Sequence, residues 1–185
     1  CIAHWVLDNY GYDKSINGHA ALGYYNGPAN IFASSIKRFG SHSFYGETNT
    51  FSLPTVTSSY PFSVSAWVYL PNVSNSTQNN VVMNTSIGGQ RVTLCYVDWS
   101  NSGNFEWSIM YGGANHWTFA PSPALQPNTW YHIVWTVVGS NNSSHAVYQN
   151  GVPLTSVTNR GGSHGGNAGW ALGGNIDGIE NFIGY

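Results

Sequence analysis

The sequence predicts an all-β protein, an antiparallel two-sheet jelly-roll sandwich, and three observations support this prediction. Runs of β-branched and aromatic residues are separated by Gly, Pro, Asn and Ser clusters, which is typical of short strands joined by turns. No stretch has convincing helical periodicity. Asn150-Gly151 lies between two short apolar runs and is the strongest short-range hairpin signal. At 185 residues, the chain is expected to form a single domain over 1–185.

The first clear strand is "FSVSAWVYL", residues 62–70, in which apolar residues alternate with a second set of side chains. That second face carries Trp67 and Tyr69, so it is not expected to be plainly solvated. Three more strands are predicted at 91–97, 105–111 and 116–120.

The segment "WYHIVWTVV", residues 130–138, is apolar on both faces. Such a strand is expected in the middle of a sheet that is covered on both sides. "HAVYQNGVPL" predicts the Asn150-Gly151 hairpin, and "GWALGG" predicts one more strand after a glycine-rich loop.

The composition excludes two classes of partner. Charged residues make up only 6 % of the chain and the formal net charge is -2, so nucleic acid is not expected to bind. No window approaches 18 consecutive apolar residues, so no membrane insertion is expected. The chain opens at Cys1, as a mature secreted chain would after cleavage of a signal peptide.

N-glycosylation motifs favour a secreted, extracellular glycoprotein of eukaryotic type. They lie in polar stretches such as "PNVSNSTQNN" and "GSNNSSH", and the acceptors are Asn72, Asn75, Asn84, Asn141 and Asn142. The two cysteines, Cys1 and Cys95, could form one disulfide or remain as two buried thiols. The sequons favour the oxidised pair.

Four segments together resemble a known family. They are "AHWVLDNYGYDKSINGH", "IKRFGSHSFYGETNTFSLP", "PFSVSAWVYLP" and "NTWYHIVWTVVGSNNSSHAVYQNGVPL". In this order they are similar to laminin-G-like, concanavalin-A-like jelly rolls, from Ala3 to about Tyr185. The resemblance implies a sandwich fold and leaves activity open, because such sandwiches serve as lectins, adhesion modules, glycosidases and lyases.

The resemblance also implies a final strand after "GGNIDGIENFIGY", but the sequence stops there. We therefore expect an open sheet edge beside Ile2–Leu7, with Ile2, His4 and Val6 available to a partner strand. The same comparison suggests a structural calcium near the opening loop, with Asp8 and Asp13 as ligands. The alternative is that these two aspartates only shape an exposed turn. No other cofactor is expected.

Catalysis is not expected. Retaining glycosidases need two carboxylates about 5–5.5 Å apart, and residues i and i+2 of a strand would supply them. Glu47, Glu106 and Glu180 have no carboxylate at such a spacing. The seven histidines form no H-x-H or H-E-x-x-H motif, and no G-x-S-x-G is present.

Two binding functions remain. The first is a non-catalytic module for extracellular assembly or adhesion, in which copies of the chain or other glycoproteins pair through the open edge into a fibre or coat. The second is lectin-like glycan binding through exposed aromatic side chains. The candidates for stacking on sugars are Trp99, Trp117 and Trp170, with Trp107 also placed near a strand end. A polysaccharide-active enzyme is the third and least favoured alternative.

Overall fold

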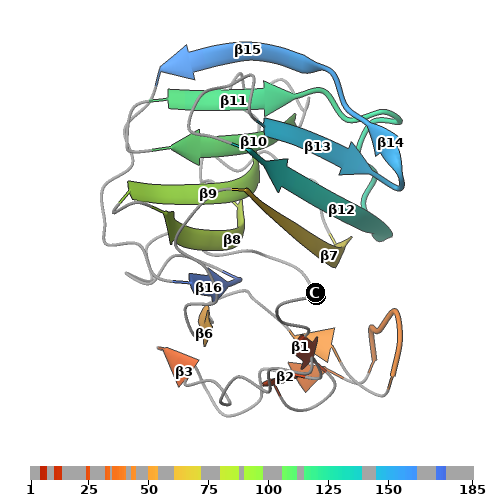
Figure 1. The fold of residues 1–185 in the computed structure, drawn as a ribbon. Helices are drawn as coiled ribbons and strands as arrows, with labels where there is room; N and C mark the ends of the chain where they lie inside the picture. Colours follow the sequence, from red (N-terminus) through yellow and green to blue (C-terminus); the bar gives the residue numbers. More distant parts are fainter. Residues whose placement is uncertain are drawn as a thin grey trace.

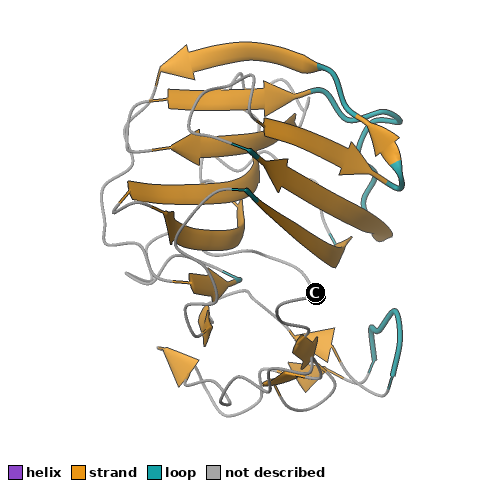
Figure 2. Ribbon diagram, in the orientation of Figure 1, coloured by secondary structure: helices purple, strands orange, loops and turns teal. Residues whose placement is uncertain are grey.

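The computed structural model of the protein describes residues 5–7, 11–13, 24–25, 32–33, 35–40, 43–44, 50–53, 61–71, 80–87, 90–97, 106–111, 115–138, 145–161 and 170–173. Strands, turns and loops make up this part of the chain, and it contains no helix (Figure 2). Consequently, none of the described segments is a helix long and apolar enough to cross a membrane.

The larger sheet has eight antiparallel strands in the order β15-β11-β10-β9-β8-β16-β6-β3. Its central strands are long and are joined by close connections in the sequence, so that consecutive strands lie side by side (Figure 1). The strands are β3 (Tyr24–Tyr25), β6 (Thr50–Leu53), β8 (Asn80–Ile87), β9 (Gln90–Val97), β10 (Glu106–Tyr111), β11 (Asn115–Phe119), β15 (Ser156–Gly161) and β16 (Trp170–Leu172).

The smaller sheet has four antiparallel strands in the order β14-β13-β12-β7. They are β7 (Phe62–Leu70), β12 (Thr129–Val137), β13 (His145–Gln149) and β14 (Val152–Pro153). This sheet lies against the part of the larger sheet that holds β9, β10 and β11 (Figure 1). The two layers form the predicted sandwich.

Four further strands form two separate pairs. β1 (Trp5–Leu7) pairs with β2 (Gly11–Asp13), and β4 (Phe32–Ala33) pairs with β5 (Ser43–Phe44). The segment 35–40 belongs to the loop that connects β4 to β5. This loop is important for the surface described below.

The hydrophobic core lies between the two sheets. Alternate residues of β7 and β12 point into it, as period-2 strands require, and the facing strands supply Leu94, Trp107 and Ile109. Phe62 and Trp135 meet edge to face with their ring centroids 5.2 Å apart. The close packing of these large side chains fixes the relation of the sheets to each other.

Buried polar side chains are also accommodated in the interior, among them Gln149 and His145. Gln149 is fully buried; its Oε1 accepts a hydrogen bond from Trp107 Nε1 at 2.9 Å, and its Nε2 donates to the carbonyl of Pro123 at 2.8 Å. Gln149 therefore links the two sheets to the loop before β12. His145 is also buried, and its Nδ1 accepts from Trp135 Nε1 at 3.3 Å. Desolvation lowers the pKa of His145 to about 4, so the imidazole is neutral at pH 7.

The strands predicted from periodicity are confirmed, with β7 spanning the predicted 62–70. The Asn150-Gly151 turn joins β13 to β14, and both residues have positive φ, 53° and 83°. β12 lies between β13 and β7 as expected, but its second face is half-buried rather than covered. The candidate site lies on that partly exposed face.

Candidate functional site

The outer face of the smaller sheet carries the aromatic side chains that do not enter the core. On β7 the alternate positions Phe62, Val68 and Leu70 are buried, whereas Trp67 is exposed and Tyr69 is half-buried. On β12 the outward set includes Trp130 and His132, both half-buried. Because β7 and β12 are antiparallel neighbours, these two sets share one surface.

Trp67 and His132 form the centre of this surface. They are direct cross-strand partners, and their ring centroids are 5.0 Å apart with an interplanar angle of 31°. The His132 ring is held from the side by the hydroxyl of Ser65, whose Oγ is 2.7 Å from His132 Nε2. The pair is thus oriented by a hydrogen bond as well as by packing.

The Asn150-Gly151 turn fixes the backbone of His132. The amide of His132 donates to Asn150 Oδ1 at 2.9 Å, and the amide of Asn150 donates to the carbonyl of His132 at 2.8 Å. An asparagine tolerates the left-handed conformation that this turn requires. Its side chain here also accepts the hydrogen bond from the His132 amide.

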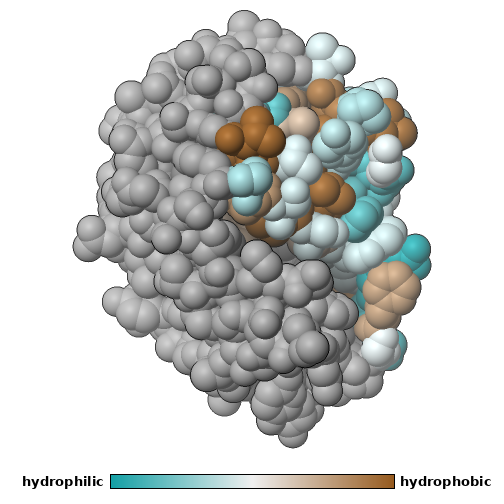
Figure 3. Space-filling view, in the orientation of Figure 1, coloured by the Kyte–Doolittle hydropathy of each residue, from teal (hydrophilic) through white to brown (hydrophobic). Residues whose placement is uncertain are grey.

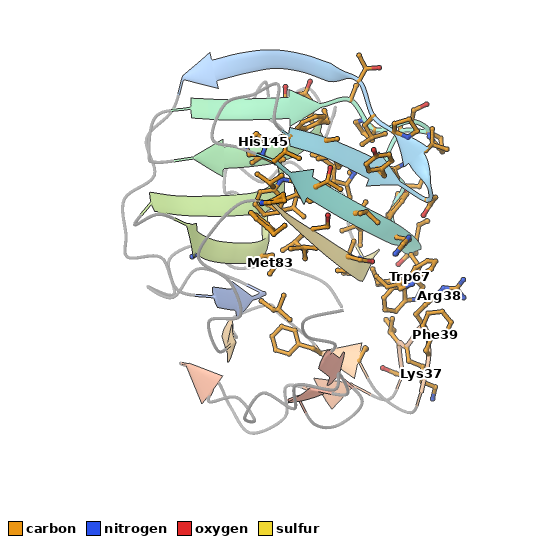
Figure 4. All side chains as sticks on the ribbon, viewed as in Figure 1. Lys37, Arg38, Phe39, Trp67, Met83 and His145 are labelled. Atoms are coloured by element: carbon orange, nitrogen blue, oxygen red, sulfur yellow. The ribbon has the colours of Figure 1, made fainter. Side chains whose placement is uncertain are left out.

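The β4–β5 loop brings two more side chains onto the same surface. Arg38 lies with its guanidinium carbon 4.5 Å from the centroid of the Trp67 ring and 5.1 Å from that of Phe39. Phe39 meets Trp67 edge to face, with centroids 5.8 Å apart. Figure 4 shows the three side chains gathered on one side of the molecule. We call Arg38, Phe39, Trp67 and His132 the aromatic cluster.

The loop that carries Arg38 and Phe39 is anchored at both of its ends. The Ser43 hydroxyl, at the start of β5, donates a hydrogen bond to the carbonyl of Ile36. Gly40 has φ 68°, a left-handed conformation that favours glycine and lets the loop turn back to β5. Local bonds therefore shape the loop, and its contact with β7 is made by Arg38 and Phe39 on Trp67.

The aromatic cluster is open to solvent. Phe39 is 65 % exposed and Trp67 is 37 % exposed, both large values for aromatic residues in a sandwich. In the space-filling view, the described surface mixes brown apolar side chains with teal polar ones (Figure 3). Beside the cluster, Tyr69 and Trp130 form a second pair with centroids 5.4 Å apart, and the Tyr69 hydroxyl donates to Asn128 Oδ1 at 3.2 Å.

This arrangement has the chemistry of a binding surface. Arg38 lies over both rings, and Phe39 is the more exposed of the two aromatic side chains. Exposed rings offer flat apolar area to a ligand. The Arg38 guanidinium and the Ser65 hydroxyl beside His132 are polar groups that could fix its orientation. In the described part of the chain no carboxylate oxygen lies within 4 Å of the Arg38 guanidinium, whose contacts there are with the two rings.

One predicted glycosylation site is wrong. Asn84 lies in β8 and its side chain is fully buried, opposite Thr93 and Ala171 in the neighbouring strands. An N-linked glycan needs an acceptor that reaches solvent, so Asn84 cannot carry one in the folded domain. The acceptors Asn72, Asn75, Asn141 and Asn142 lie outside the described residues.

The structure places three of the four tryptophans singled out from the sequence, and stacking of Trp99, Trp117 or Trp170 on a sugar stays a prediction. Trp107 lies near the start of β10 as expected, but it is fully buried and bonded to Gln149, so it cannot stack on a sugar. Trp117 lies in the middle of β11, paired with both β10 and β15, and Trp170 is the first residue of β16. Trp99 lies outside the described residues.

The remaining predicted positions are placed only in part. Cys95 lies inside β9, between β8 and β10, while Cys1 is outside the described residues, so the disulfide stays a prediction. Asp13 ends β2 and Asp8 is outside the described residues. Within the described ranges, no three His, Cys, Asp or Glu residues come together to hold a metal ion. The calcium site also stays a prediction.

The predicted open edge falls at β1. Val6 pairs with Tyr12 of β2, whereas Ile2 and His4 lie outside the described residues. Among the described residues β1 is paired with β2, and complementation by a partner strand stays a prediction.

The comparisons with known proteins agree with this fold. Residues 45–185 match the model of the family described as the concanavalin A-like lectin/glucanases superfamily. The chain belongs to this superfamily. No curated protein sequence gives a significant match.

One solved structure is similar to this chain in its fold. It is domain 4 of AbnA, a GH43 extracellular arabinanase from Geobacillus stearothermophilus, in complex with arabinotriose. The likeness covers 94 % of this chain and 83 % of that one, with a TM-score of 0.60 and 24 % sequence identity. The predicted jelly-roll class is confirmed, and Arg38 and Phe39 lie before the residues that match the family model.

Proposed function

We propose that this protein is a non-catalytic carbohydrate-binding domain of an extracellular protein, and that it binds glycans at the aromatic cluster. The observation that carries the proposal is the exposed Phe39 ring, which lies beside Trp67 and the Arg38 guanidinium on the outer face of the smaller sheet. The apolar C–H face of a sugar would contact the Phe39 ring and the edge of Trp67. Sugar hydroxyls would accept hydrogen bonds from Arg38.

The comparisons support this proposal in outline. The description of the superfamily includes lectins, and the similar arabinanase domain was solved with arabinotriose bound. Arabinan is therefore a suitable first ligand to test, together with a panel of other plant and animal polysaccharides.

The non-catalytic part of the proposal is supported by the placement of carboxylates. Glu106 is at the start of β10, and the residue two positions further along the same face is Ser108, not a second acid. A pair of carboxylates across a glycosidic bond is what hydrolysis would need.

Removal of the Phe39 ring tests the proposal. Phe39→Ala deletes apolar area that is mostly in water, so we expect the fold to be retained and glycan affinity to fall about tenfold or more. Isothermal titration calorimetry against each polysaccharide that the unaltered protein binds would measure the change.

Val138→Ala is the matched control, since Val138 is 68 % exposed and follows the Val137–Phe62 pair, five register positions along the sheet from the His132–Trp67 pair. This variant is expected to bind as the unaltered protein does. Equal affinities of the two variants, or no binding of any saccharide, would contradict the proposed function.

A further inference from the structure

Resting on the proposed function, we infer that the aromatic cluster selects an acidic saccharide, one whose carboxylate or sulfate group binds the Arg38 guanidinium. The aromatic rings would contact the sugar ring, and the arginine would bind the anionic substituent. This assigns a ligand class to the site as well as a location.

The first step is the state of Arg38. It is exposed, its contacts in the described part of the chain are the rings of Phe39 and Trp67, and no carboxylate there neutralises it. Arginine remains charged at all accessible pH values and presents five N–H donors in a planar fork. A guanidinium that stacks on a ring uses its face for that contact and keeps its N–H edge for hydrogen bonds.

The second step is the fit of that edge to an anion. Carboxylate and sulfate oxygens accept two parallel hydrogen bonds from a guanidinium, and such charge-assisted bonds are about twice as strong as neutral ones. A neutral hydroxyl would use only part of this donor set. The rings of Phe39 and Trp67 also hold the guanidinium in place, so less side-chain freedom is lost when a ligand binds.

The third step is the distribution of charge. The chain has five Lys and Arg residues in total, and two of them, Lys37 and Arg38, are adjacent in the exposed β4–β5 loop. Because the formal net charge is -2, the protein as a whole does not attract polyanions. Preference for an acidic sugar would therefore come from Arg38 rather than from the overall field of the protein.

The experiment compares polygalacturonate with its methyl ester, which has the same sugar backbone without the negative charge. Calorimetric titrations would be done at about 0.05 M salt, where surface electrostatics are only partly screened. We expect the acidic form to bind at least about tenfold more tightly, and Arg38→Gln to remove that difference. Arg38→Lys, which keeps the charge but loses the fork, should retain only part of it.

Arg160→Gln provides the matched control. It removes the same charge from β15, at the edge of the larger sheet, and should leave the preference for the acidic form unchanged. Unfolding midpoints of all variants would show that the fold is retained.

The outcomes separate the inference from the proposed function. If both forms bind equally and Phe39→Ala weakens both, the site binds glycans but the inferred selectivity is wrong. If the acidic form binds more tightly but Arg38→Gln leaves this unchanged, the inference is also wrong. If neither these nor any other saccharides bind, the proposed function fails and the inference fails with it.

Discussion

At the scale of single residues, the buried His145 is an ionisable group whose protonation is expected to affect the stability of the domain. His145 is buried beside Trp135, with the two rings stacked at a centroid distance of 6.2 Å. Trp135 Nε1 donates to His145 Nδ1, so the neutral imidazole fits the site and the cation does not. The depressed pKa of His145 follows from this burial.

We expect the domain to lose stability as the pH falls from about 6.5 to about 4. In the unfolded chain His145 takes up a proton near pH 6.5, whereas the folded protein resists until its pKa of about 4, so protons favour unfolding in this window. The contribution of His145 between pH 7 and pH 5 should be about 1–2 kcal/mol. Urea unfolding at both pH values would measure it.

His145→Gln isolates this contribution from those of the other ionisable groups. The variant is expected to be less stable at pH 7, but to lose less free energy of unfolding than the unaltered protein when the pH is lowered to 5. An identical loss in both proteins would show that His145 is not the group responsible.

The residues of the candidate site were only partly predictable from the sequence. The period-2 pattern of "FSVSAWVYL" places Trp67 and Tyr69 on the second face of β7, and this face is indeed partly exposed. The same pattern could not show that Phe39 and Arg38 would lie on Trp67, since that contact joins residues nearly thirty positions apart. Asn84 shows the opposite error, because a local sequon says nothing of the neighbouring strands that bury it.

At the scale of elements, the β13–β14 hairpin has both a structural role and a role in the site. Its turn needs two consecutive residues with positive φ, and Asn-Gly is the dipeptide that adopts this conformation most readily. Such local signals made the long strands and this hairpin predictable. The β4–β5 loop lacks a comparable signal, since its position depends on a contact with a distant strand.

Asn150→Ala is expected to weaken both the hairpin and the site. Alanine in the left-handed region costs about 1–2 kcal/mol, and the variant also loses the hydrogen bond between Asn150 Oδ1 and the His132 amide. We expect a total destabilisation of about 2–3 kcal/mol in chemical unfolding, with weaker glycan binding because His132 supports Trp67.

Gly151→Ala is the control for backbone strain. A Cβ atom at this position meets no other atom within 4 Å, so the cost is that of the positive φ alone, about 1–2 kcal/mol. Glycan affinity should then be unchanged. If the two variants were equally stable and bound glycans equally well, the Asn150 side chain would have no role beyond its conformation.

At the scale of the whole molecule, the protein combines a very low charge content with an exposed arginine, Arg38, in the aromatic cluster. Its five basic and seven acidic residues are few for a chain of 185. The stability of the sandwich therefore depends on the apolar core and on backbone hydrogen bonds between strands, which salt affects little. Binding of an acidic glycan at Arg38, by contrast, depends on a charge that salt screens.

Salt should therefore separate folding from binding in this protein. Between about 20 mM and about 500 mM NaCl the Debye length falls severalfold, and exposed charges contribute correspondingly less. We expect the free energy of unfolding to change by less than about 1 kcal/mol over this range, as measured in urea. The affinity for an acidic saccharide should fall severalfold over the same range, whereas the affinity for its neutral ester, which rests on Phe39 and Trp67, should hold. Parallel loss of stability and of both affinities would mean that charge supports the fold itself, contrary to the composition of the core.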